Sequence, residues 1–225
     1  MTTIPEGLLR LRSAGFTPSA ILDIGAYEGW FARTCRTVWP DAYILMIDAL
    51  REKEAILAAV REEIGNANLL ITLLGREYHD NVPFYVVHAG TPSSRIKTGS
   101  SKYREKTGIP TEELRLPQDT LDALLSDNGH AFEFIKLDIQ GAEMEVLGGA
   151  VNTLQQCHAV MMELSLLEYN EGAPLIAEVL PRMAQFGFVL YDIIDLTRFS
   201  NTPHLNQIDG LFVRPNSPLR LKFNG

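Results

Sequence analysis

The sequence predicts an α/β fold built around an open, mostly parallel sheet. Short apolar runs alternate along the chain with stretches whose apolar residues recur at helical spacing, which is the order of strands and crossover helices in such a sheet. A turn with two glycines joins the first apolar run to the next helix. The chain has 225 residues, of which 46% are hydrophobic and 21% charged, enough for one sizeable core. We therefore expect a single α/β domain over residues 1–225.

The first strand and its turn are the most informative stretch. The strand Ala20–Asp23 is followed by a turn that holds Gly25 and Gly29, and then by a helix. Gly25 would let a ligand approach the backbone, and Gly29 would let the helix pack close to the strand. The second strand, Tyr43–Ile47, ends in Asp48, an acid placed to accept hydrogen bonds from two ribose hydroxyls. Strand, glycine turn, helix, strand and acid together predict half of a nucleoside-cofactor site.

The glycine spacing distinguishes between cofactors. Dinucleotide sites use Gly-x-Gly-x-x-Gly, whose second glycine lets the backbone press against a pyrophosphate. Here the pattern is Asp-x-Gly-x-x-x-Gly, which lacks the third glycine and begins with a carboxylate that repels a pyrophosphate. S-adenosylmethionine, with an ammonium and a sulfonium but no phosphate, fits this turn better; a turn that binds nothing is the alternative. The candidate cofactor contacts in this half are Asp23, Gly25, Ala26, Glu28, Gly29 and Asp48.

The elements around this half-site follow the same alternation. Residues 1–15 are expected to form an N-terminal helix that ends at Gly15. A further helix, Lys53–Ile64, leads to a third strand, Leu69–Leu74, which ends at Gly75. Residues at this strand end commonly flank the adenine in such folds. Leu74 and Gly75 are therefore further candidate cofactor contacts.

The alternation breaks in the middle of the chain. Pro83–His88 is predicted as an extra strand, and Glu113–Leu116 as a short one. Residues 92–108 show no periodicity and carry five basic residues against one acidic residue. Because long irregular loops in compact domains often act as lids or binding loops, residues 89–112 are a candidate lid or substrate loop. A solvated flexible loop is the alternative. The candidate substrate contacts in it are Ser100, Ser101 and Lys102.

Carboxylates follow the next two core strands. The fourth strand, Phe134–Leu137, is followed by Asp138, and the fifth, Ala159–Met162, is followed by Glu163. The carboxyl ends of the strands face the ligand crevice in an open α/β sheet. Asp138 is therefore the best-placed group for acceptor contact or general base, and Glu163 could assist it. Asp138, Gln140 and Glu143 are also candidate cofactor contacts, although an acid in the first turn of a helix can simply favour the helix N-terminus.

The same two carboxylates raise the question of a metal. Asp138 and Glu163 could hold a divalent cation that binds the acceptor oxygen. A cation of this kind needs more oxygen ligands, and no third one is evident from the sequence. A divalent metal is therefore possible but not expected.

The last third of the chain predicts a reversed strand. A helix follows Pro174, and Pro181 within it is expected to kink or split it. Two further strands, Phe188–Tyr191 and Ile208–Val213, have no helix-length pattern between them. They are therefore expected to pair antiparallel.

Three segments resemble the FkbM-type S-adenosylmethionine-dependent methyltransferases. Ile21–Ala26 matches the opening motif of that family, which usually continues with Asn where Tyr27 stands. Ile135–Glu143, Ile-Lys-Leu-Asp-Ile-Gln-Gly-Ala-Glu, matches its most distinctive run, usually Lys-Ile-Asp-Val-Glu-Gly-Ala-Glu, with Gln140 in place of a glutamate. Ile208–Arg214 is similar to its closing strand. Asp48 also stands where the family more often has glutamate.

The resemblance implies both a fold and an activity. The fold is a Rossmann-like class I methyltransferase sheet of seven strands, the last antiparallel, with helices on both faces. The activity is O-methylation, in this family often of sugars or secondary metabolites, so a small-molecule hydroxyl acceptor is expected. A cofactor-binding module without catalysis is one alternative. A nicotinamide-dependent oxidoreductase is another, but it would need the three-glycine loop.

The composition of the chain indicates which partners and which cellular compartment to expect. The net charge of −8 argues against a dedicated nucleic-acid binder. Cys35 and Cys157 have no paired spacing, which suggests a reducing compartment. No apolar run approaches the ~20 residues of a membrane span, and the first residues lack the pattern of a signal peptide. A soluble, cytoplasmic protein is expected, with neither a nucleic acid nor a membrane as partner.

Overall fold

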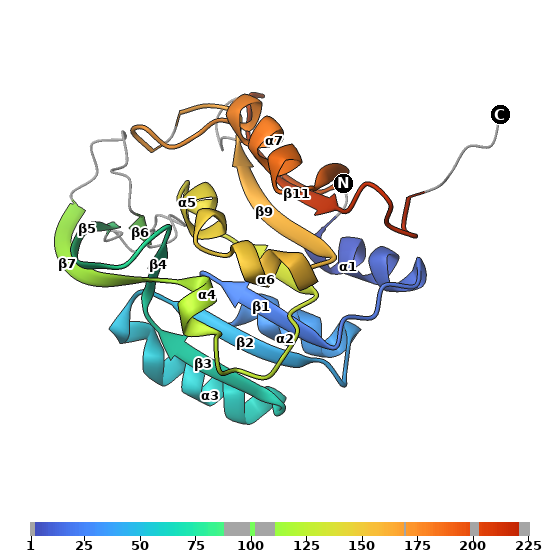
Figure 1. The fold of residues 1–225 in the computed structure, drawn as a ribbon, viewed down its shortest axis with the longest axis horizontal. Coiled ribbons are helices and arrows are strands. Elements are labelled where there is room, and N and C mark those ends of the chain that lie inside the picture. Colours follow the sequence, from blue (N-terminus) through green and yellow to red (C-terminus); the bar gives the residue numbers. More distant parts are fainter. Residues whose placement is uncertain (1–2, 88–99, 102–110, 169, 199–202, 221–225) are drawn as a thin grey trace.

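The main element of the fold is a seven-stranded sheet. The computed structural model describes residues 3–87, 100–101, 111–168, 170–198 and 203–220. The strands of the sheet lie in the order β10-β11-β9-β8-β1-β2-β3 (Figure 1). Neighbouring strands from β9 to β3 are parallel, whereas β11 runs antiparallel to both β10 and β9. The expected seven-stranded, mostly parallel sheet with its last strand reversed is confirmed.

The two central strands, β1 and β8, are buried along their whole length. This is the pattern of a parallel sheet with both faces covered. The register places Asp23 of β1 beside Met46 of β2 on one side and beside Lys136 of β8 on the other. The strands of this sheet are β1 (Ala20–Ile24), β2 (Tyr43–Asp48), β3 (Ala67–Ile71), β8 (Phe134–Leu137), β9 (Ala159–Ser165), β10 (Val189–Arg198) and β11 (Leu205–Val213).

Helices cover both faces of the sheet, as expected (Figure 1). Consecutive residues of β1 point to opposite faces, so Ile21 packs in the core beneath the first set of helices and Leu22 in the core beneath the second. The first set is α1 (Ile4–Ser13), α2 (Trp30–Val38) and α3 (Glu54–Ile64), the last preceded by the 3-10 turn η1 (Arg51–Lys53). The second set is α4 (Leu121–Leu124), α5 (Glu143–Gly148), α6 (Val151–Gln156) and α7 (Ile176–Gln185).

A second, four-stranded sheet was not anticipated. The run Leu69–Leu74 was expected to be one strand, but the ladder of β3 ends with a hydrogen bond from the Thr72 N–H to the Asp48 carbonyl, because β2 itself ends at Asp48. The chain from Leu73 onward pairs with β7 instead. The small sheet, in the order β4-β7-β5-β6, therefore begins at the carboxyl end of β3 (Figure 1). Its strands are β4 (Leu73–Gly75), β5 (His79–Val87), β6 (Ser100–Ser101) and β7 (Thr111–Thr120).

The C-terminal strands are longer than expected, because β10 continues past Tyr191 to Arg198 and β11 begins at Leu205, before Ile208. Strands β10 and β11 pair antiparallel, as expected. Helix α7 is continuous through Pro181, so of the two expected effects of this proline the split does not occur. Among the described residues, no helix is long and apolar enough to cross a membrane.

Candidate active site

The turn after β1 is shaped by the backbone of the strand beside it. Gly25 has a φ of +77°, and a Cβ on it would collide with the carbonyl oxygen of Asp138. The N–H groups of Gly25 and Ala26 both donate to the Ile47 carbonyl, at 2.9 and 3.1 Å. Glycine is therefore needed here because the turn passes close to β8, a reason independent of any ligand.

Gly29 begins α2 with a φ of +73°. A Cβ at this position would lie 2.8 Å from the side chain of Val60 in α3. This glycine was expected to bring the helix close to the strand. In the structure it brings α2 close to the neighbouring helix α3.

Asp48 fastens the turn to the end of β2. One carboxylate oxygen accepts the N–H of Tyr27 at 2.8 Å, and the other accepts the N–H of Leu50 at 2.9 Å. Tyr27 has a φ of +53°, a left-handed conformation that asparagine adopts more readily than tyrosine. A carboxylate offers about four acceptor positions. The two backbone donors thus leave acceptor capacity for a ligand.

The Tyr27 ring forms a cation–π contact at the same turn. Lys53 Nζ lies 3.8 Å from the centre of the ring and 3.6 Å from a carboxylate oxygen of Glu28. The Glu28 side chain is 53% exposed, whereas that of Lys53 is nearly buried. The aromatic side chain therefore covers a lysine stem that would otherwise face water.

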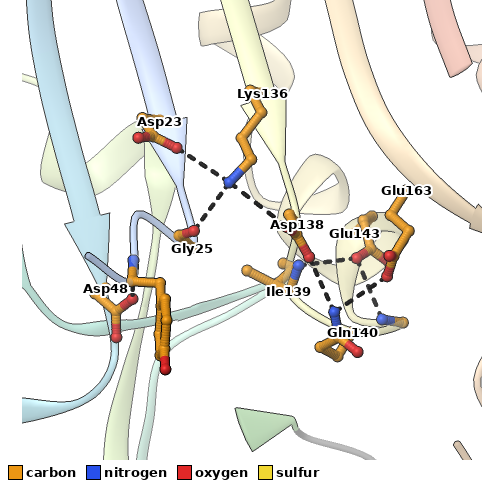
Figure 2. Close-up of polar contacts among 11 residues, drawn as sticks. Asp23, Gly25, Asp48, Lys136, Asp138, Ile139, Gln140, Glu143 and Glu163 are labelled. Carbon is orange, nitrogen blue, oxygen red and sulfur yellow. Dashed lines mark hydrogen bonds and ion pairs between the residues drawn. The ribbon is translucent and has the colours of Figure 1, made fainter. Parts of the chain in front are cut away.

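Lys136 is a site residue that the sequence analysis missed. Its Nζ donates to the Gly25 carbonyl at 2.9 Å and lies 3.1 Å from Asp23 Oδ1 and 3.9 Å from Asp138 Oδ2 (Figure 2). Asp23 is fully buried, and none of the described residues gives its oxygens a donor with hydrogen-bond geometry, so the ion pair with Lys136 compensates its charge. A lysine in a four-residue buried strand was the available signal, because such a charge needs a partner.

The carboxylates keep Lys136 charged. Burial alone lowers the pKa of this lysine, but Asp23 and Asp138 raise it above its ordinary value overall. Burial also raises the pKa of Asp23, an effect that Lys136 opposes. The ammonium therefore holds together the turn after β1 and the end of β8.

Asp138 and Glu163 meet through an amide. The side-chain N–H₂ of Gln140 donates to Asp138 Oδ1 at 2.9 Å and to Glu163 Oε2 at 3.1 Å (Figure 2). The Asp138 side chain is 34% exposed, so a ligand can reach it. Strand β9 was expected to end at Met162, but it continues to Ser165 because it pairs with β11, where Asp209 lies opposite Glu163.

Glu143 is buried and supports the loop that carries Gln140. One carboxylate oxygen accepts the N–H groups of Ile139 and Gly141, at 3.1 and 3.2 Å. Burial raises the pKa of Glu143 from 4.5 to about 7, although these hydrogen bonds lower it. The residue thus fixes the loop between β8 and α5 from within.

A match to a known protein family identifies the chain. A model described as the methyltransferase FkbM domain matches residues 23–190. The chain belongs to the FkbM methyltransferase family. The suspected resemblance is confirmed, and the protein is an S-adenosylmethionine-dependent methyltransferase by family.

Solved structures show the same class I methyltransferase fold. Magnesium protoporphyrin IX methyltransferase from Synechocystis PCC 6803, solved with bound S-adenosylmethionine, superposes with a TM-score of 0.54 at 10% identity, covering 94% of this chain and 77% of that one. An rRNA methylase from Streptococcus thermophilus superposes with a TM-score of 0.51 at 10% identity, covering 93% of each chain. No curated protein matches the sequence.

The remaining predicted residues of this FkbM chain lie in the small sheet or outside the described residues. Leu74 and Gly75 are buried in β4, where Leu74 joins the core of the main sheet. Ser100 and Ser101 form β6, which pairs with β5. Lys102 and most of the candidate lid, 89–112, lie outside the described residues. Among the described residues, no three His, Cys, Asp or Glu side chains come together as a metal site.

Proposed function

We propose that this FkbM methyltransferase methylates the oxygen of a hydroxyl group on a sugar or secondary metabolite. The observation that carries the proposal is a pair of carboxylates joined by the Gln140 amide: Asp138, directly after β8, and Glu163, near the end of β9. A hydroxyl must lose its proton to accept a methyl group, and a carboxylate within reach can take it. Asp138 is partly exposed and anchored by two neighbours, which suits a general base.

The cofactor site is proposed at the turn after β1. When bound, S-adenosylmethionine supplies a methyl group already activated for displacement. The residues fit it in two respects: Asp48 retains acceptor capacity for ribose hydroxyls, and acids suit a cationic ligand. Asp23 and Glu143 are buried and paired inside the protein, so we assign them supporting roles. The proposed contacts are Gly25, Ala26, Glu28, Gly29, Asp48, Leu74, Gly75, Asp138 and Gln140.

The protein's own part in the reaction is positioning and proton removal. The Gln140 amide orients Asp138 from one side, and Lys136 lies near its other oxygen. Asp138 would hold the acceptor hydroxyl and take its proton as the methyl group is transferred. Glu163 would accept a second hydrogen bond from the acceptor. Ser100, Ser101 and Lys102 are proposed acceptor contacts, in a single cytoplasmic domain that acts on small molecules and on neither nucleic acids nor membranes.

The test separates cofactor binding from transfer. Calorimetry with S-adenosylhomocysteine should show binding to one site per chain. Methyl-labelled S-adenosylmethionine and a panel of sugar and polyketide alcohols, phenols, amines and thiols should then yield a labelled ether, identified by mass spectrometry and NMR. Binding with no transfer to any acceptor would favour the non-catalytic module. Label on nitrogen or sulfur alone would overturn the O-methylation proposal.

A further inference from the structure

The amide of Gln140 lies where two acidic side chains converge. Asp138 and Glu163 come from neighbouring parallel strands, and Asp209 of β11 lies opposite Glu163 in the register. Carboxylates this close disfavour each other's charged form unless a cation or hydrogen-bond donors lie between them. Gln140 provides two N–H protons, one directed at each acid. A neutral group thus supplies a donor to each acid, while the Lys136 ammonium lies 3.9 Å from the other oxygen of Asp138.

The orientation of this amide follows from its surroundings. A glutamine side chain has an oxygen on one side and N–H₂ on the other, and only N–H₂ can face two carboxylates without repulsion. Turning the oxygen toward them would replace two attractive contacts with two repulsive ones. The hydrogen bonds thus determine which end of the amide points at the acids.

The backbone beneath Gln140 is fixed as well. Gln140 has a φ of +59°, an uncommon conformation for a side-chain-bearing residue. Its carbonyl accepts a hydrogen bond of 2.7 Å from the side chain of Asn170, which is itself nearly buried. The two flanking residues, Ile139 and Gly141, donate to Glu143. The loop is thus held on both sides of Gln140, so its side chain is directed at the acids before any ligand binds.

We propose that Gln140 is a positioning residue that holds Asp138 and Glu163 in the place a divalent cation would otherwise take. The acceptor site then works without a metal, and the two acids remain available to the acceptor hydroxyl. An isosteric change of the amide to a carboxylate removes both donors and adds a third oxygen ligand at the same point. Gln140→Glu is therefore expected to turn the pair into a cation site. The role of the two acids toward the acceptor hydroxyl rests on the proposed function. The binding of a cation does not, because it can be measured without cofactor or acceptor.

The first experiment measures Mn²⁺ binding to the full chain by electron paramagnetic resonance, without cofactor or acceptor. Wild type should leave Mn²⁺ free at about 1 mM, a concentration at which weak oxygen-ligand sites fill. Gln140→Glu should bind one Mn²⁺ at least about tenfold more tightly, equivalent to about 1.4 kcal/mol. Adding Asp138→Asn to that variant should reverse the gain, which locates the ion. Thermal unfolding with and without Mn²⁺ shows that each variant is folded, and a variant folded only with Mn²⁺ also supports the proposal.

Two results would overturn the proposal. One is wild type binding Mn²⁺ as tightly as Gln140→Glu, which would mean that the amide turns its oxygen to a metal. The other is a folded Gln140→Glu with no gain in affinity.

A second experiment examines the wild-type amide directly and does not depend on the folding of Gln140→Glu. In ¹H–¹⁵N spectra, the side-chain pair that disappears in Gln140→Met belongs to Gln140. Asp138→Asn and Glu163→Gln should each shift a different proton of that pair, whereas the exposed control Asp127→Asn should shift neither. An unchanged pair in both acid variants would show that no bridge exists.

Discussion

The acidic groups at one edge of the sheet are held in two contrasting ways. Asp23 is fully buried and meets the ammonium of Lys136 between the two central strands. Asp138 and Glu163, one strand further along, are partly exposed and meet a neutral amide. Breaking a buried ion pair leaves an uncompensated charge and costs stability, whereas an exposed, donor-held acid can be changed at little cost to the fold. The first pair thus supports the architecture, and the second is available for chemistry.

The largest expected effect tests the buried pair. Lys136→Met should lower the free energy of unfolding by about 3–5 kcal/mol, because it strands the Asp23 carboxylate in the core. Urea unfolding at pH 7 measures it. The matched control is Lys53→Met, which removes another nearly buried lysine whose acidic partner, Glu28, is exposed. That variant should lose only about 1 kcal/mol. Equal losses would mean that the contact of Lys136 with Asp23 contributes no more to stability than the contact of Lys53 with Glu28.

The next effect is a pH dependence from Glu143, a buried acid whose hydrogen-bond donors among the described residues are the backbone N–H groups of Ile139 and Gly141. The pKa of Glu143 is about 7 in the folded protein and 4.5 ordinarily, so folding favours the protonated form of this carboxyl group. The associated stability is fully present below pH 4.5 and is lost as the pH rises through 7. The difference between the two pKa values of Glu143 corresponds to about 3 kcal/mol of stability.

Urea unfolding from pH 4 to 8 should therefore show wild type losing about 3 kcal/mol relative to Glu143→Gln. Glu145→Gln, in the same helix but partly exposed, should follow wild type. Parallel curves for wild type and Glu143→Gln would show that Glu143 ionises normally.

Asp138→Asn tests the partly exposed acids, Asp138 and Glu163. The amide cannot take a proton, so turnover of a labelled acceptor from the panel should fall by about a hundredfold. The unfolding free energy should stay near wild type, and most of the affinity for S-adenosylhomocysteine should remain, because Asp138 is only one of the proposed cofactor contacts. The control is Asp127→Asn, which changes an exposed acid in the turn after α4. Wild-type turnover in Asp138→Asn would move the base to Glu163.

The smallest effect concerns the cofactor turn. Asp48→Ala should weaken S-adenosylhomocysteine binding by about 1.5–3 kcal/mol, the range for hydrogen bonds to a charged group. Calorimetry measures it. Asp48→Asn, which keeps one acceptor oxygen, should lose less. A loss smaller than about tenfold in Asp48→Ala would mean that the ribose does not contact this acid.

The main sheet was predictable because its signals are local. Four-residue runs that are mostly apolar predicted the central strands, and the absence of a helix-length pattern before Ile208 predicted the reversed strand. The small sheet was missed because its signals depend on distant partners. Strand β4 continues an apolar run without a break and leaves the main sheet only because β2 has ended. Strand β7 is largely polar and gains its length by pairing with β5.

The candidate site was predictable in its residues more than in their roles. The motif identified Asp23, Gly25, Asp138 and Glu143 as notable positions, and they do gather at one edge of the sheet (Figure 2). Their partners depend on register and on backbone conformation, which sequence patterns do not specify. The role of Lys136 requires knowing that β8 pairs with β1. The role of Gln140 requires its left-handed backbone.

The hydrogen bond from Lys136 to Gly25 joins residues 111 positions apart. During folding, β1 can pair with β2 through a short connection. Its other edge pairs with β8, which comes from the second half of the chain and is therefore expected to join later. Until β8 arrives, Asp23 remains hydrated and the turn after β1 lacks the ammonium that holds it. The two halves of the chain therefore become native together, and closing this long loop is expected to limit the rate at which the turn takes its final shape.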